Sequence, residues 1–219
     1  RVSISSDAST LSVGIETTRP KLAPNLKLVA ENLRQPAWDP KEFELDKQET
    51  IAGAEQMQND PETLAENVLS RHLGPYPASD PRYTDTPEEL MAQAKSLTLD
   101  QVKAYYAKVY GANHGEAAVV GDFDPAEIEK ILTETLGDWK SPVVYERIPG
   151  QYFDVPALNK EVSVKDKANA TLVGGLNLVM RDDNPDYLPL VLGNFMLGGG
   201  FLNSRLATRV RQKEGLSYG

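Results

Sequence analysis

The sequence contains no cysteine in its 219 residues. This absence removes disulfides, thiolate metal ligands and cysteine nucleophiles from the candidate explanations of its function. Only two histidines are present, His72 and His114, and they lie far apart in the chain. A zinc site built on histidines needs several on one face, for example a pair at i and i+4. We therefore expect His72 at a helix end and His114 in a turn, with no metal site made from histidines alone.

Long apolar runs are also absent. No stretch approaches the roughly 18 apolar residues of a membrane-spanning helix, so no membrane span is predicted. No secretory signal is present at the start, where residues 2–17 already alternate in the manner of a strand. We expect both ends to be cuts in a longer chain.

The charge is unevenly distributed. The net charge is −9, yet residues 203–219 carry four cationic side chains against Glu214 alone, which leaves −12 for residues 1–202. A chain this acidic is not expected to bind nucleic acid. Its 40% apolar and 25% charged residues are typical of a globular protein with a sizeable core.

The pattern of apolar residues predicts an α+β fold, with antiparallel strands packed against helices. Residues 2–17 read as a hairpin, and short strands are also expected at 115–123 and within 160–180. Helices are expected over residues 21–36, 41–57, 59–73, 98–111, 124–139, 185–197 and 203–215. Two of them have an aspartate cap followed by proline, at Asp39 and Asp124.

Prolines mark the connections. Residues 74–90 are rich in proline and turn formers and are expected to form a structured surface loop. Residues 141–160 contain several prolines without helical periodicity, so we expect an extended linker. The predicted organisation is therefore the C-terminal part of one domain (1–140), a linker (141–160) and the start of another domain (161–219).

The glycines Gly198, Gly199 and Gly200 invite a phosphate-binding interpretation. A phosphate loop of the Walker type needs Lys-Ser/Thr directly after its last glycine, but Phe201 and Leu202 follow here. A dinucleotide motif would place its glycines after a strand, whereas these follow a helical run. We therefore expect a helix end and a mobile connector, followed by a helix capped by Asn203 or Ser204 and ended by Gly215.

Two groups of polar residues remain as candidates. Arg211 and Tyr218 flank the end of the last helix, and a guanidinium with a hydroxyl is well suited to holding peptide carbonyls. Carboxylates are abundant in the predicted helix 41–57, and the ordinary explanation for them is a solvent-exposed helix face. These are Glu42, Glu44, Asp46, Glu49 and Glu55.

The sequence resembles the pitrilysin, insulysin and mitochondrial processing peptidase family of zinc metallopeptidases, the inverzincins. Three ordered stretches carry the resemblance, and together they cover essentially the whole chain. They are "QPAWDPKEFELDKQETIAGAEQMQNDP", "YYAKVYGANHGEAAVVGDFD" and "LGGGFLNSRLATRVRQKEGLSYG".

The resemblance implies repeated α+β domains of the processing-peptidase type, paired into halves that close like a clamshell around a peptide. In members with two such pairs, one half carries an HxxEH motif and a glutamate from a later helix, which together bind zinc. The other half is catalytically silent. HxxEH is absent from this chain, although in an active half it would precede residue 1.

The later helix distinguishes the two halves. By the resemblance, the third zinc ligand falls on Gly53, and its acidic neighbour falls on Asp46. Glycine has no side chain to ligate zinc, so no catalytic residue is expected in this chain. A shifted register would offer Glu49 or Glu55 instead, and these remain the alternative metal ligands.

We therefore predict a bacterial protein in which this chain is part of the non-catalytic half of a zinc-dependent metalloendopeptidase, as the end of its third domain, a linker and the start of its fourth. The chain alone is expected to be inactive and free of zinc. Its partners would be a peptide substrate, held by Arg211 and Tyr218, and a catalytic half on the same polypeptide or a partner subunit. The periplasm is favoured over the cytoplasm because bacterial relatives with this layout are often exported. The alternatives are a part of the catalytic pair and a structural subunit without peptidase activity.

Overall fold

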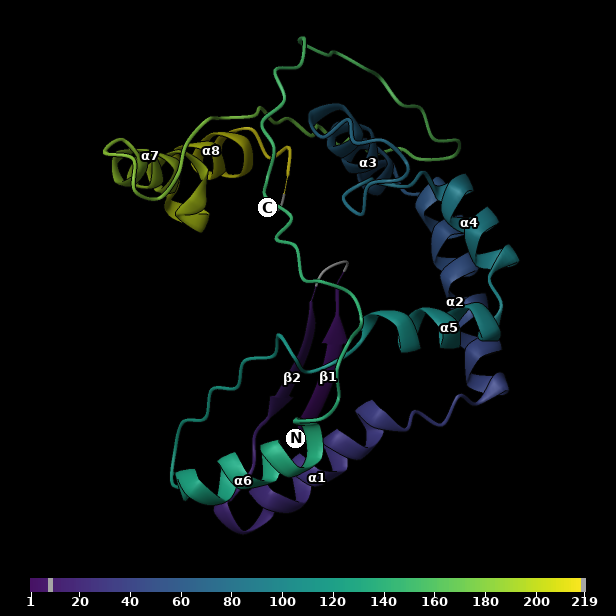
Figure 1. Cartoon of the computed structure of the whole chain (residues 1–219). Coiled ribbons are helices and arrows are strands. Elements are labelled where there is room, and N and C mark those ends of the chain that lie inside the picture. Colours follow the sequence, from purple (N-terminus) through teal and green to yellow (C-terminus); the bar gives the residue numbers. More distant parts are fainter. Residues whose placement is uncertain (8–9, 218–219) are drawn as a thin grey trace. The chain divides into compact units, whose positions relative to one another are not determined.

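The structure is a computed structural model that describes residues 1–7 and 10–217. The chain divides into two compact units, residues 1–175 and 176–219 (Figure 1). The predicted division into a third-domain end, a linker and a fourth-domain start remains a prediction.

The first unit contains a hairpin and a series of helices. Their bounds are β1 (Val2–Ser6), β2 (Leu11–Ile15), α1 (Arg19–Arg34), α2 (Pro40–Gln58), α3 (Pro61–Leu73), α4 (Pro87–Ser96), α5 (Leu99–Val109) and α6 (Pro125–Leu136). The second unit contains α7 (Tyr187–Asn194), the π-helix η1 (Phe195–Gly199), the 3₁₀ turn η2 (Phe201–Asn203), the short α8 (Arg205–Ala207) and the π-helix η3 (Thr208–Lys213).

The hairpin has the predicted antiparallel pairing. Val2 lies opposite Ile15, and Ile4 lies opposite Val13. Because side chains alternate between the two faces of a strand, these apolar residues share one face, which also carries Ser6 and Leu11, and Ser3, Ser5 and Ser12 share the other. The expected period of two along residues 2–17 is confirmed.

Aspartates before prolines begin three of the helices. The side chain of Asp39 accepts a hydrogen bond from Lys41 N at 2.8 Å, and that of Asp124 accepts one from Ala126 N at 2.9 Å, as predicted. Asp60 caps α3 in the same way. Each cap satisfies a backbone N–H that has no partner within its helix, and the following proline removes another such donor.

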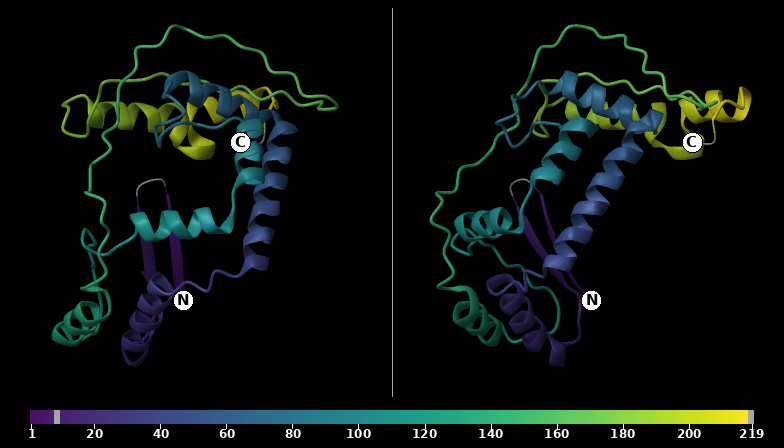
Figure 2. Two further views of the ribbon diagram at one scale, coloured as in Figure 1. Left: turned by 45° about the vertical axis from the view of Figure 1, so that its right-hand side comes forward. Right: turned by 90° about the vertical axis from the view of Figure 1, so that its right-hand side faces the viewer.

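Two helix pairs hold the first unit together. Helix α1 packs along α6, with Val29, Ala30 and Leu33 buried on one and Ile128 and Ile131 on the other (Figure 1). Ion pairs from Arg19 to Asp122 and from Arg34 to Asp138 flank this contact. Helix α2 packs along α4, where Ala54 and Ala94 are buried (Figure 2). Their small side chains let these two helices approach closely.

Two strand predictions and one loop prediction are wrong. Residues 115–123 and 160–180 form no strand, and Val120 is 98% exposed. An alternating segment becomes a strand only where a neighbouring segment shares its hydrogen bonds. Among the described residues only β1 and β2 pair in this way. The loop predicted at 74–90 ends early because α4 begins at Pro87.

In the second unit Ser204 is the predicted cap. It is buried, and its hydroxyl accepts a hydrogen bond from Ala207 N at 3.2 Å. The connector expected at residues 198–200 is wrong: Gly198 and Gly199 continue the helix as part of η1, and only Gly200 ends it, without a positive φ. Gly215, with φ of 64°, is the predicted helix exit. None of the helices among the described residues combines the length and apolar character needed to cross a bilayer.

Candidate functional site

The face of α2 that carries Gly53 is exposed. Asp46, Glu49 and Gly53 lie at spacings of three and four, so they share this face. Glu55 follows Gly53 by two residues and therefore lies on the far side of the helix. A Cβ added at Gly53 would meet nothing within 4 Å. The two alternative ligands thus occupy different faces, and only Glu49 shares the face of Gly53.

These donors do not form a zinc site by themselves. Zinc sites combine ligands that converge from several elements and usually include histidine or cysteine. Here the candidate carboxylates all come from α2, and both histidines lie elsewhere. His72 contacts the Pro156 carbonyl through Nε2 at 2.8 Å, and the His114 ring lies 5.5 Å from the Tyr145 ring. Within residues 1–7 and 10–217, no group of three or more metal-binding side chains comes together.

Arg211 lies in the π-helix η3. Its side chain is half-buried. The hydrogen bond from Glu214 N to Arg209 O, at 3.1 Å, spans five residues, as is typical of a π-helix. This widening changes the direction in which the side chains project compared with a regular α-helix. Single π-turns occur frequently at functional sites.

The residues beside Arg211 form hydrogen bonds and an ion pair with nearby residues of the second unit. Arg209 Nη2 forms an ion pair with Glu214 at 2.7 Å, and Gln212 Nε2 donates to the Leu202 carbonyl at 3.1 Å. Leu216 N donates to the Val210 carbonyl at 3.0 Å, which closes the helix end at Gly215. Tyr218, the predicted companion of Arg211, lies outside the described residues.

A polar network on the loop after α3 was not predicted from the sequence. Arg82 donates to Asp80 from Nε at 2.9 Å and from Nη2 at 2.7 Å. These hydrogen bonds, together with the Arg82 backbone N–H, lower the pKa of Asp80 to about 2. The Arg82 guanidinium also lies 4.2 Å from the centre of the Tyr76 ring. The sequence "ASDPRYTD" indicates a turn, but it does not indicate that Arg82 binds Asp80 and Tyr76.

Tyr83 and Glu89 extend this network to α4. The Tyr83 hydroxyl lies 2.9 Å and 3.0 Å from the two carboxylate oxygens of Glu89, and Arg71 forms an ion pair with the same carboxylate at 3.1 Å. Glu89 also accepts a hydrogen bond from Thr86 N. This backbone contact, followed by that of Tyr83, lowers the pKa of Glu89. These contacts connect the loop to Arg71 on α3 and to Glu89 on α4.

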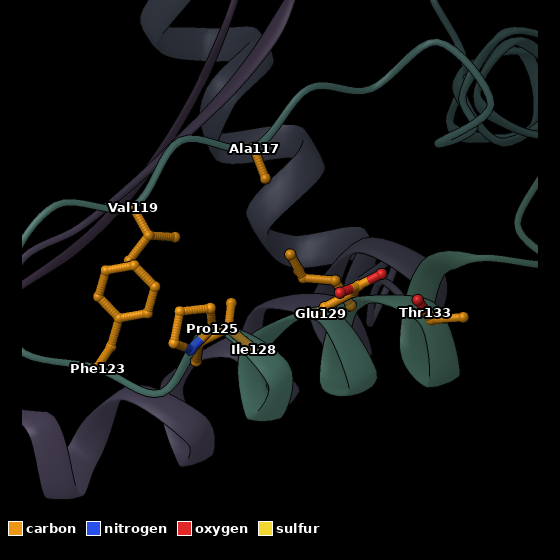
Figure 3. A pocket seen from close by; sticks show the side chains of 8 residues that line it. Ala117, Val119, Phe123, Pro125, Ile128, Glu129 and Thr133 are labelled. Carbon is orange, nitrogen blue, oxygen red and sulfur yellow. The ribbon is translucent and has the colours of Figure 1, made fainter.

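A shallow hollow of about 360 Å³ lies between α6 and the extended segment before it (Figure 3). Ala117 and Val119 line one side from the extended segment, and Phe123, Pro125 and Ile128 lie opposite, with the Phe123 ring directed toward Val119. Glu129 is the only ionisable group in its lining. One carboxylate among apolar groups provides neither a nucleophile with its base nor a set of metal ligands.

The comparisons with known proteins identify a family. The model described as "Peptidase M16 inactive domain" matches residues 96–219. The "Non-peptidase homolog YmxG" of Helicobacter pylori is 26% identical over 225 residues, covering 99% of this chain and 49% of that protein. An "Uncharacterized zinc protease" of Streptomyces coelicolor is 30% identical over 128 residues, covering 56% of this chain and 28% of that protein.

A solved structure agrees with these matches. The crystal structure of a peptidase M16 inactive domain from Pseudomonas fluorescens aligns with 100% of this chain and 52% of its own length, with a TM-score of 0.68 and 25% identity. This chain thus spans about half the length of that structure and of the Helicobacter pylori relative. The resemblance carried by the three sequence motifs is confirmed, and the chain belongs to the peptidase M16 family, in the part described as its inactive domain.

Proposed function

We propose that this chain belongs to the non-catalytic half of a zinc-dependent metalloendopeptidase, where it encloses and positions a peptide substrate. The observation that carries the proposal is the match of residues 96–219 to the inactive domain. The exposed glycine at position 53 supports it, because the motif alignment expects a zinc-ligating glutamate at this point of α2. The chemistry of bond cleavage would then reside on the other half.

The proposed role of Arg211 is to hold the substrate backbone. A guanidinium presents several N–H donors in a fixed plane, and peptide carbonyls accept such bonds without regard to the side chains of the substrate. Glu214 forms its ion pair with Arg209. Arg209 is therefore a structural residue in this proposal, and Arg211 is the one directed at substrate. Tyr218 is proposed to add a hydroxyl contact beside it.

The proposal includes an arrangement for the whole protein. Residues 1–140 would end a third α+β domain, residues 141–160 would connect, and residues 161–219 would begin a fourth. A catalytic half on the same polypeptide or a partner subunit would supply HxxEH and the zinc ion. A bacterial periplasmic location is part of the same proposal.

A structural or assembly role without peptidase activity is the second candidate. It is favoured by the name of the Helicobacter pylori relative, a non-peptidase homolog that aligns with 99% of this chain. In that case the domain would serve to bind a partner protein. The exposed face around Gly53 is compatible with this role as well, because an assembly role does not require a zinc ligand at this position.

The two candidates are separated by assaying the complete protein that contains this chain. The purified protein, together with any chain that co-purifies, would be incubated with a mixture of unfolded peptides, and cleavage would be followed by mass spectrometry. The first candidate predicts cleavage that a zinc chelator abolishes. A stable complex without cleavage at any zinc concentration would overturn it and support the second candidate.

A further inference from the structure

The segment between α6 and α7 has no regular secondary structure, yet part of it is held tightly (Figure 1). Arg82 Nη1 donates a hydrogen bond to the Pro149 carbonyl at 2.5 Å. The same guanidinium is already fixed by Asp80 and lies over the Tyr76 ring, so it is presented to Pro149 in one orientation. A preorganised donor of this kind loses little conformational entropy when it binds.

An aromatic contact follows four residues later. The Phe153 ring meets the Tyr76 ring edge to face, with centroids 4.9 Å apart and an interplanar angle of 87°. This is a favoured geometry for aromatic pairs. Tyr76 therefore contacts Arg82 and Phe153 together, which links the charged network of the loop to the extended segment.

A third contact lies at the end of α3. His72 Nε2 is 2.8 Å from the Pro156 carbonyl oxygen. Because a carbonyl only accepts hydrogen bonds, Nε2 must carry the proton in this contact. Arg82, Tyr76 and His72 thus hold residues 149–156 through two backbone carbonyls and one aromatic side chain. Aromatic contacts are also used where proteins bind extended, proline-rich peptides.

The chain returns to the same helix at Gly175. A Cβ built on Gly175 would lie 3.1 Å from Leu73 Cδ1 and 3.4 Å from Leu69 Cδ2, so the glycine backbone approaches the last turns of α3 closely. Gly174, by contrast, has nothing within 4 Å of such a Cβ. The connecting segment therefore meets α3 or its following loop at two places, around residues 149–156 and at Gly175.

We propose that residues 149–156 form a strap, fastened to α3 and its following loop by His72, Tyr76 and Arg82, which makes this part of the connection an integral piece of the first unit. The connection between the units is then not a free spacer starting after α6. The rest of the connection before Gly175 is residues 157–174, a loop whose two ends lie on α3. This inference stands independently of the proposed peptide-holding function.

Chymotrypsin provides the test because it cleaves after aromatic residues. Tyr152 and Phe153 lie within the strap, where the Tyr152 side chain is 49% exposed and that of Phe153 is half-buried, whereas Tyr145 lies outside it and is 62% exposed. The strap predicts that the 219-residue chain is cut after Tyr145 well before it is cut after Tyr152 or Phe153. In Arg82→Ala and Tyr76→Ala, cleavage within the strap should accelerate roughly five- to tenfold, because proteolysis follows the population of the open form.

The control is Arg19→Ala, which removes the ion pair with Asp122 elsewhere in the same unit and should leave the strap cleavage rate unchanged. Equal cleavage after Tyr145 and Phe153 in the unmodified chain would overturn the proposal. So would unchanged strap cleavage in both Arg82→Ala and Tyr76→Ala.

A second measurement needs no disruptive variant. Because the chain has no cysteine, a single nitroxide can be attached at Asp154→Cys, within the strap, or at Glu146→Cys, outside it. The strap predicts slower nitroxide motion at position 154 than at position 146. Equally fast motion at both positions would contradict the proposal.

Discussion

The carboxylate of Asp80 is held by Arg82 through two hydrogen bonds, at 2.9 Å and 2.7 Å. Their effect is a pKa lowered from 3.8 to about 2. A carboxyl whose pKa is lower in the folded state contributes stability that is fully present above its unfolded value and is lost as the pH falls through the folded value.

This pKa predicts how acid affects the loop. Between pH 4 and pH 2, the free energy of unfolding should fall as Asp80 becomes protonated and releases Arg82. Asp80→Asn should be less stable than the unmodified chain at pH 7 and should lose less stability across this interval. Urea unfolding at a series of pH values measures both. The control is Asp182→Asn, at an exposed position of the second unit. If Asp80→Asn and the unmodified chain showed the same dependence of stability on pH, the lowered pKa of Asp80 would not be the source of the acid sensitivity.

Gly53→Ala should stabilise the protein. Glycine in a helix interior costs about 0.5–1 kcal/mol relative to alanine, and the new methyl group would meet nothing within 4 Å. Gly111→Ala is the contrasting variant, because its Cβ would lie 2.1 Å from Ser141 N and must displace backbone. Thermal unfolding should show opposite changes in Tm for the two variants. A lower Tm for Gly53→Ala would mean that this face of α2 is covered.

Thr86→Ala should destabilise α4. The Thr86 hydroxyl accepts a hydrogen bond from Glu89 N at 3.2 Å, and the Glu89 carboxylate accepts one from Thr86 N at 2.8 Å, which together form a capping box. Loss of the hydroxyl should reduce the free energy of unfolding by about 1 kcal/mol. Thr86→Ser retains the acceptor and should restore most of this stability. If Thr86→Ser does not restore this stability, loss of the capping hydroxyl is not the cause of the destabilisation in Thr86→Ala.

The sequence was sufficient for elements whose signals are local. Asp39 and Asp124, each followed by proline, marked the starts of α2 and α6, and Gly215 marked a helix exit. Helix α4 was missed although Thr86 and Glu89 have the capping-box spacing, because the prolines before them suggested a loop. Local signals therefore predict helix ends well when they are read together.

The rest depended on contacts between distant residues. The alternation in residues 115–123 suggested a strand, but alternation says nothing about whether a partner strand is alongside. The strap depends on Tyr76 meeting Phe153 and on Arg82 meeting Pro149, pairs that are far apart in the chain. For the candidate site, the motifs placed Gly53 and Arg211 on helices correctly, and the π-helical setting of Arg211 had no sequence signal.

The proposed role of this chain, holding substrate for chemistry performed elsewhere, is tested most directly at Arg211. In the complete protein, Arg211→Ala should lower kcat/KM for peptide cleavage roughly 10- to 100-fold, as expected for loss of charged hydrogen bonds to substrate, while the zinc content stays unchanged. Arg209→Ala, two residues away and paired with Glu214, should retain nearly full activity. An unchanged kcat/KM in Arg211→Ala would contradict the account.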